Sequence, residues 1–308
     1  MRIVFFGTPA FAVPSLRALL DEGAQVVAVV TQPDRPRGRS RSTLVPPPVK
    51  QLALERGIPV FQPDRPTGDL FLTSLRRLEP ELGVVVAYGH LLKPELLAIP
   101  RQGMINVHAS LLPELRGAAP IPWAILRGDA RTGITIMQME AGLDTGPVLH
   151  QVDTPITPWE TSGSLTERLG ALGATALVEA LALRRAGQLR AVPQDHARAT
   201  YAPKVNRAMS RLDWEGAADQ VARQVRAFDP APGAWTTLEG GAELKLFGAR
   251  PVAAEGEPGT ILSLEPYLVV AAGQGAVAVD EVQPTGKKRM PAEAWGRGRG
   301  ARVGQRFR

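Results

Sequence analysis

The sequence of 308 residues contains no cysteine, four histidines and no long apolar run. Without thiols the chain can form neither a disulfide framework nor a thiolate metal site, and it has no cysteine nucleophile. The absence of cysteine fits the cytoplasm, where we expect the protein to reside. No apolar run approaches the roughly 18 to 20 residues that a membrane span needs. We therefore expect a soluble protein with no membrane partner.

Several catalytic motifs are also missing. The histidines at positions 90, 108, 150 and 196 form no HxH or HExxH pair, so we expect no metal site. The first apolar segment is followed by GTPAFA rather than GxGxxG, and this argues against a dinucleotide cofactor. A serine hydrolase could combine Ser110, His108 and Asp144, but the GxSxG motif is absent.

Charge is distributed unevenly along the chain. The formal net charge is +6, with 44% hydrophobic and 21% charged residues. Residues 34 to 50 hold five basic side chains against Asp34 alone, and residues 284 to 308 hold eight against Glu293 alone. Two basic clusters on a nearly neutral body indicate a phosphate-rich partner, because contacts to phosphates release counterions. The alternative is a solvated loop and a basic tail.

The length suggests two domains, each large enough to bury a core. In the first part, short β-branched runs alternate with helical patterns. Strands are expected at 2–6, 25–31, 82–86, 104–108 and 134–139, and helices at 14–20, 49–56, 69–78 and 162–185. This alternation predicts a Rossmann-like α/β domain with a parallel-rich sheet. Such sheets bind ligands at the carboxyl ends of their strands.

The second part begins with a helical pattern at 217–228. Short strand-like runs separated by Gly and Pro follow it, at 234–238, 243–247, 259–264, 267–271 and 276–282. They predict a small OB-like β-barrel, a fold that often binds nucleic acids. We expect an N-terminal domain over 1–189, a linker over 190–207 and a C-terminal domain over 208–308.

Polar side chains stand at the end of the strand predicted for 104–108. Asn106 and His108 are two residues apart and so point to the same face. An amide can donate to a developing oxyanion, and an imidazole can exchange a proton near neutral pH. Asp144, in a glycine-flanked turn, could orient the imidazole. The alternative is a structural role for all three residues: a satisfied polar pair at the end of a strand and an ordinary aspartate in a turn.

Longer strings make the pattern specific. FFGTPAFAVPSL, TQPDRPRGR, VVVAYGHLL, INVHASLLPELRGAAP, TIMQMEAGLDTG and VQPTGKKRM occur in the order and spacing of the methionyl-tRNA formyltransferases, and the chain resembles this family over almost its whole length. The NxH, SLLP and DTG elements alone would also fit glycinamide ribonucleotide formyltransferases. TQPDRPRGR and GKKRM favour the tRNA enzymes.

The resemblance implies roles for individual residues. The catalytic trio would be Asn106, His108 and Asp144. Two segments would contact the folate: the SLLP segment (Ser110, Leu111, Leu112 and Pro113) and a loop whose backbone would meet the pterin ring (Val86, Ala87, Tyr88, Gly89, His90 and Leu91). Phe11 would lie near the methionine side chain. The tRNA would contact Arg39 and Arg41 in the first basic cluster and Lys287, Lys288 and Arg289 in the second.

The implied reaction transfers the formyl group of the co-substrate 10-formyltetrahydrofolate to the α-amino group of methionine on initiator methionyl-tRNA. The partners are then the tRNA and the reduced folate, and we expect a monomer. Formyl transfer to glycinamide ribonucleotide or to an amino sugar is an alternative, and so is a non-catalytic RNA-binding protein.

Overall fold

A computed structural model describes residues 1–37, 43–298 and 300–308 and divides the chain into two compact units. The first unit comprises Met1–Pro120, Thr132–Thr154 and Thr166–Pro203; the second comprises Ile121–Arg131, Pro155–Leu165 and Lys204–Arg308. The domain boundaries expected from the sequence stay a prediction.

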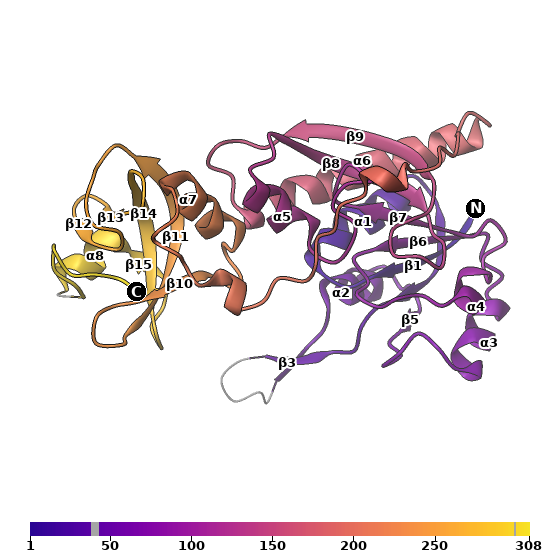
Figure 1. The fold of residues 1–308 in the computed structure, drawn as a ribbon. Helices are drawn as coiled ribbons and strands as arrows, with labels where there is room; N and C mark the ends of the chain where they lie inside the picture. Colours follow the sequence, from indigo (N-terminus) through magenta and orange to yellow (C-terminus); the bar gives the residue numbers. More distant parts are fainter. Residues whose placement is uncertain (38–42, 299) are drawn as a thin grey trace. The chain divides into compact units, whose positions relative to one another are not determined.

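A seven-stranded sheet with the order β5-β2-β1-β6-β7-β8-β9 forms the centre of the first unit (Figure 1). Its strands are β1 (Arg2–Gly7), β2 (Gln25–Val30), β5 (Val60–Phe61), β6 (Leu82–Val86), β7 (Met104–His108), β8 (Arg131–Gln138) and β9 (Val148–Pro155). Neighbours from β5 to β7 pair in parallel, and β8 runs antiparallel to β7. The parallel-rich sheet is therefore confirmed. After Arg2, strand β1 is apolar and buried to its end, because both faces of the sheet are covered.

Helices and a small hairpin complete the chain up to Pro203, and the helix over 120–127 belongs to the second unit apart from its first residue. They are η1 (Ala10–Ala12), α1 (Val13–Asp21), β3 (Arg35–Arg37), β4 (Thr43–Val45), α2 (Pro48–Glu55), α3 (Asp69–Arg77), α4 (Pro94–Leu97), α5 (Pro120–Arg127), α6 (Ser162–Arg185) and η2 (His196–Arg198). Met104 of β7 belongs to a core cluster with Leu72 and Leu75 of α3 and Leu96 of α4. Asn106 and His108 follow Met104 on the same face of the strand.

The opposite face of β7 meets helix α6. A Cβ atom at Gly173 would lie 3.0 Å from a side-chain carbon of Val107, so this helix runs close to the strand. Asn106 and His108 therefore point away from α6. They extend the face covered by α3 and α4 to the carboxyl end of the strand.

A six-stranded antiparallel sheet forms the second unit, with the order β10-β11-β14-β13-β12 and β15 paired to β14. Its elements are η3 (Ala208–Ser210), α7 (Ala218–Ala227), β10 (Ala234–Thr237), β11 (Glu243–Val252), β12 (Ile261–Ser263), β13 (Leu268–Ala271), β14 (Ala276–Pro284), β15 (Met290–Pro291) and α8 (Ala292–Arg297). Val221 and Val225 of α7 join the same core as the sheet, and the ring of Trp214 stacks on Phe307 at 5.8 Å. This antiparallel sheet agrees with the predicted OB-like fold.

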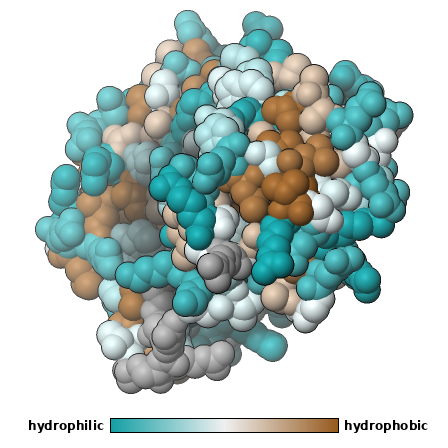
Figure 2. Space-filling view, turned by 90° about the vertical axis from the view of Figure 1, so that its left-hand side faces the viewer, coloured by the Kyte–Doolittle hydropathy of each residue, from teal (hydrophilic) through white to brown (hydrophobic). Residues whose placement is uncertain are grey.

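The surface is mixed in character. Figure 2 shows one face of the molecule, where apolar side chains gather locally among hydrophilic ones. Within residues 1–37, 43–298 and 300–308, no helix has the length and apolar character required to cross a membrane.

Candidate active site at the carboxyl end of the sheet

Asn106 and His108 end strand β7, between β6 and the antiparallel β8. The His108 side chain is only 6% exposed, whereas Asn106 is partly exposed. The His108 Nε2 atom lies 3.0 Å from the carbonyl oxygen of Leu115. Because a carbonyl can only accept, Nε2 carries the proton in this arrangement and donates it to Leu115. The Nδ1 atom therefore remains available to accept a proton.

Asp144 lies in the turn between β8 and β9 and approaches the other side of the same imidazole. Its Oδ2 atom is 3.8 Å from His108 Nδ1, and it accepts a hydrogen bond of 2.8 Å from the backbone N–H of Gly117. A separation of 3.8 Å is too long for a direct hydrogen bond, but it places the carboxylate beside the imidazole. The structure thus brings together two residues that are 36 positions apart in the sequence.

The SLLP segment follows β7 and is fixed by internal hydrogen bonds. The Ser110 hydroxyl donates to Glu114 O at 2.6 Å, and Thr135 Oγ1 donates to Ser110 O at 2.6 Å. The Ser110 hydroxyl is therefore engaged with backbone rather than with His108. Leu112 is buried, whereas Leu111 and Pro113 are partly exposed and can meet a ligand.

The loop over Val86–Leu91 alternates buried and exposed residues. Val86 and Tyr88 are buried, His90 is partly exposed, and Ala87, Gly89 and Leu91 are exposed. The Tyr88 carbonyl accepts hydrogen bonds from Thr8 Oγ1 at 3.0 Å and from Gln32 Nε2 at 3.1 Å. These two side chains fix the loop at the carboxyl end of β6, so that its exposed backbone can face a ligand.

The Tyr88 side chain points into the core rather than toward solvent. Its ring meets Phe6 edge to face at 5.5 Å, and its hydroxyl has no hydrogen-bond partner among the described residues. Burial raises the pKa of this hydroxyl to about 12, because the charged form loses its hydration. In this conformation only the backbone of Tyr88 is placed to contact a ligand.

Phe11 and the base of the hairpin β3–β4 flank the first unit's sheet. Phe11 is partly buried and lies against Gly170 of α6.

At the hairpin, Lys50 Nζ lies 2.8 Å from both Asp34 carboxylate oxygens, and Gln62 Nε2 donates to Oδ1 at 2.8 Å. The hydrogen bonds from Gln62 and Lys50 lower the pKa of Asp34. Arg39 and Arg41, the predicted tRNA contacts, lie outside the described residues.

The basic residues near the C-terminus differ in their surroundings. Lys287 and Lys288 are exposed. Arg289 contacts Asp229 at 2.8 Å and Glu281 at 2.5 Å, and its guanidinium carbon lies 4.2 Å from the centroid of the Phe247 ring. The two carboxylates compensate its charge. Arg289 is therefore a structural residue in this conformation, and Lys287 and Lys288 are the freer cations.

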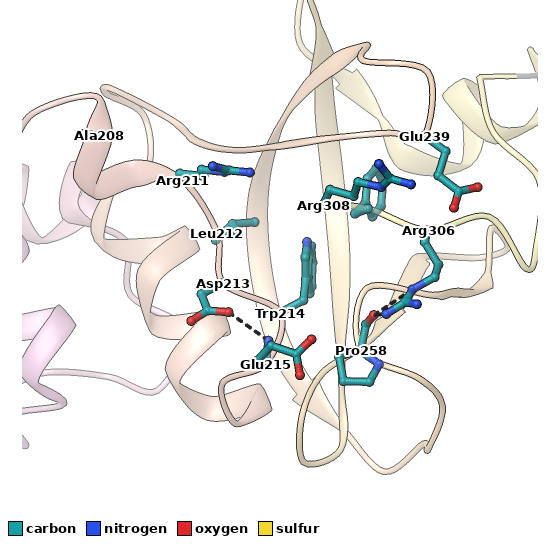
Figure 3. A pocket seen from close by; sticks show the side chains of 11 residues that line it. Ala208, Arg211, Leu212, Asp213, Trp214, Glu215, Glu239, Pro258, Arg306 and Arg308 are labelled. Carbon is teal, nitrogen blue, oxygen red and sulfur yellow. Dashed lines mark hydrogen bonds between the residues drawn. The ribbon is translucent and has the colours of Figure 1, made fainter.

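A pocket of about 630 Å³ lies entirely within the second unit (Figure 3). Its walls include the arginines at 211, 306 and 308 and the acidic residues Asp213, Glu215 and Glu239. Arg306 donates to Pro258 O at 2.8 Å and pairs with Glu257. Because basic and acidic side chains balance one another here, the pocket does not concentrate positive charge for a phosphate.

Two residues that the sequence did not single out stand behind the site. Arg116 is 2% exposed, and its Nη2 donates to Gln194 Oε1 at 2.7 Å. Gln194 in turn donates to the backbone carbonyls of Asp144 and Gly146 at 2.9 and 2.7 Å. In the sequence, Arg116 could have been noticed only as the arginine of the string SLLPELRG. Gln194 falls in the segment that was predicted to be a linker.

The fold and the site together are those of an α/β enzyme. An amide, an imidazole and a carboxylate lie beyond the carboxyl edge of a parallel-rich sheet. The model of the formyl transferase family matches residues 1–181, and that of the formyl transferase C-terminal domain matches residues 204–300. The chain belongs to the formyl transferase family.

Curated relatives match over nearly their whole length. The chain is 50% identical over 295 residues to the methionyl-tRNA formyltransferase of Methylococcus capsulatus, covering 95% of each chain. It is 53% identical over 289 residues to the methionyl-tRNA formyltransferase of Pseudomonas paraeruginosa, covering 94% of this chain and 93% of the relative.

Solved structures share the fold at lower identity. HypX from Aquifex aeolicus, in complex with tetrahydrofolic acid, gives a TM-score of 0.68 at 22% identity; the match covers 97% of this chain but 47% of HypX, so the chain spans about half of that protein. The N-formyltransferase from Helicobacter canadensis, in complex with folinic acid and dTDP-3-aminofucose, gives 0.69 at 17% identity and covers 92% of this chain and 98% of that one.

Proposed function

We infer that this protein transfers the formyl group of 10-formyltetrahydrofolate to the α-amino group of methionine on initiator tRNA, which produces formylmethionyl-tRNA for translation initiation. The observation that carries this conclusion is the identity of about 50% with methionyl-tRNA formyltransferases over 95% of the chain. The approach of His108 and Asp144 beside Asn106 supports it.

The proposed reaction is a direct acyl transfer. The neutral amine attacks the formyl carbon, a carbon–nitrogen bond forms, and the bond from carbon to folate N10 breaks. The Asn106 amide would donate to the oxyanion of the tetrahedral intermediate. One proton leaves the attacking nitrogen, and one is delivered to N10, so that the protons balance.

His108 and Asp144 would handle the proton. Because Nε2 already donates to Leu115 O, His108 would accept the proton at Nδ1, the ring nitrogen that lies 3.8 Å from Asp144 Oδ2. The carboxylate stabilises the resulting imidazolium by electrostatic attraction. Gly117 keeps the carboxylate in place through its N–H.

The substrates would meet the remaining predicted residues. We expect the folate to contact the exposed part of the loop over 86–91 and the partly exposed Leu111 and Pro113, and Phe11 to lie near the methionine side chain. Arg39, Arg41, Lys287 and Lys288 would contact the tRNA. We also propose that the protein acts as a monomer in the cytoplasm, with no metal in the reaction.

The deciding experiment measures incorporation of labelled formyl groups from 10-formyltetrahydrofolate. Charged initiator tRNA is compared with glycinamide ribonucleotide, with a nucleotide-linked amino sugar and with uncharged tRNA. Rapid transfer to methionyl-tRNA alone is expected. Faster transfer to a small amine would show that this amine, and not methionyl-tRNA, is the substrate. RNA binding without transfer to any acceptor would instead indicate a non-catalytic RNA-binding protein.

A further inference from the structure

Arg116 is a buried cation that faces neutral acceptors. Its side chain is among the largest fully buried ones in the described part of the chain, at 2% exposure. Nε and Nη2 lie 3.1 and 2.7 Å from Gln194 Oε1, and Nη2 lies 3.1 Å from His196 Nδ1. Burying a guanidinium is costly unless its donors are satisfied. A costly arrangement beside a reaction site requires an explanation.

The arginine fixes the orientation of the Gln194 amide. A guanidinium can only donate hydrogen bonds, so the amide oxygen must face Arg116 and the amide nitrogen must face the other way. That nitrogen donates to Asp144 O at 2.9 Å and to Gly146 O at 2.7 Å. Gln194 itself is 7% exposed, so water competes little for these bonds. Arg116 thereby turns Gln194 into a clamp on two carbonyls of the Asp144 turn.

The clamp acts on a backbone conformation that needs support. Asp144 has a φ of 51°, in the left-handed region that costs a non-glycine residue on the order of 1 kcal/mol or more. Its carbonyl is held by Gln194, and its carboxylate is held by the N–H of Gly117, the neighbour of Arg116. The same short segment therefore fixes both ends of Asp144.

The backbone conformation and the surroundings of Gly117 are also constrained. Its φ is 116°, and a Cβ atom there would lie 2.9 Å from Ala202 O. Backbone hydrogen bonds from Arg116 N to Thr200 O at 2.9 Å and from Ala202 N to Arg116 O at 2.7 Å join this segment to residues near position 200. The hydrogen bonds thus connect three stretches of chain behind the Asp144 carboxylate.

We propose that Arg116 and Gln194 are positioning residues for formyl transfer: they set the Asp144 turn so that its carboxylate faces His108 Nδ1. The proposal rests on the proposed function. Neither residue needs to touch a substrate. Their contribution is to keep Oδ2 at its place during the transfer, where a displacement of about 1 Å can cost on the order of a hundredfold in rate.

The test uses Gln194→Glu. The new carboxylate keeps an acceptor for Arg116 but removes both donors to the Asp144 turn and places negative charge against two carbonyl oxygens. We expect kcat to fall about tenfold to a hundredfold, with KM for folate and for methionyl-tRNA changed less than about twofold. A matched control is Gln224→Glu, because Gln224 Nε2 also donates to two carbonyls, Met209 O at 2.9 Å and Arg211 O at 2.8 Å. It should leave kcat within about twofold of wild type.

A double-variant cycle separates positioning from general damage. If Gln194 acts through Asp144, Gln194→Glu should cost less than about twofold when it is added to Asp144→Asn. Equal losses in both backgrounds would overturn the proposal. Should Gln194→Glu fail to fold, Arg116→Met replaces it: the methionine side chain fills much of the same buried space without donors, and releasing Gln194 should still lower kcat about threefold to tenfold.

The outcomes also separate this proposal from the function on which it rests. Normal wild-type transfer together with a folded variant of unchanged kcat would overturn the positioning role alone. Absence of transfer by the wild-type protein would overturn the proposed function, and the positioning role with it.

Discussion

His108 and Asp144 face one another at 3.8 Å, while the other imidazole nitrogen already has a backbone partner at 3.0 Å. Catalytic hydrogen bonds often lengthen in the absence of substrate and tighten in the reacting complex. A small movement of the imidazole would change its coupling to the carboxylate. At the scale of single residues, a small movement of the imidazole or the carboxylate would therefore bring the two groups within hydrogen-bond distance.

Replacing either strand residue should separate chemistry from binding. We predict that Asn106→Ala and His108→Ala lower single-turnover transfer about a hundredfold to a thousandfold, because each removes a group that acts in the transition state. Affinity for tRNA should stay within about twofold of wild type. Rapid-quench transfer and filter binding measure the two quantities. A correctly folded Asn106→Ala protein with nearly wild-type transfer would exclude the oxyanion role.

The buried hydroxyl of Tyr88 predicts a pH effect on stability. Its pKa is raised to about 12, above the value near 10 of an unfolded tyrosine, so the folded state keeps the proton longer. Its contribution is complete below pH 10 and is lost as the pH rises toward 12. At pH 11 the loss should be about 1.4 kcal/mol. Urea unfolding at pH 9 and pH 11 should show this loss in wild type but not in Tyr88→Phe, and equal losses would refute the assignment.

Neighbouring basic residues should respond differently to substitution. Arg289→Ala leaves the buried Asp229 carboxylate without its guanidinium partner, and we predict a loss of about 2 kcal/mol in stability. The exposed pair Lys287→Ala and Lys288→Ala should leave the unfolding temperature unchanged and weaken tRNA binding instead. Thermal unfolding and tRNA binding distinguish the two effects. If Arg289→Ala is as stable as wild type, the ion pairs contribute nothing to folding.

Elements with a strong apolar pattern could be predicted from the sequence, and several others could not. The bounds of β6, β7 and α6 were predicted to the residue, because buried β-branched runs and a long helical repeat are unambiguous. Helix α5 was missed because it contains prolines at 120 and 122, and β9 was missed because it has no buried residue. Strand β11 extends to Val252, beyond the predicted end at 247, because Gly248 and Pro251 resemble turn signals.

The candidate site shows the same limit. The alternation in β7 predicts that Asn106 and His108 share a face, because that is a local property of a strand. The hydrogen bonds from Arg116 to Gln194 join residues 78 positions apart, and no local sequence pattern predicts them. Only the fold shows that the segment after position 190 reaches back to Asp144. Tertiary hydrogen bonds of this kind remain invisible to sequence periodicity.

Arg35 and Arg37 of the first basic cluster lie on strand β3, Lys50 lies on helix α2, and Arg39 and Arg41 lie outside the described residues. We predict that Arg39→Ala weakens tRNA binding and reduces the slope of log affinity against log salt by about one unit, because one phosphate contact is lost. Folate affinity should be unchanged. Arg77→Ala, at an exposed position on α3, is the matched control. Identical binding of Arg39→Ala and wild type at every salt concentration would move tRNA recognition away from this segment.

At the scale of the whole molecule, the two units have separate cores. We predict that a chain ending at residue 205 folds and binds reduced folate, because its sheet and the segment through Pro203 are complete. Its affinity for tRNA should fall at least tenfold. Circular dichroism, folate titration and filter binding test these points. Undiminished tRNA binding by the folded fragment would leave the second unit without its proposed role.

The hydrogen bonds between Arg116 and the segment around position 200 also have a consequence for biosynthesis. A ribosome adds Thr200 and Ala202 after every strand of the seven-stranded sheet has been made. While it is being synthesised, the chain can thus assemble its sheet before the partners of Arg116 exist. The nascent protein acquires its framework first and a fixed Asp144 later, so the growing chain should become competent for transfer only after these residues have emerged.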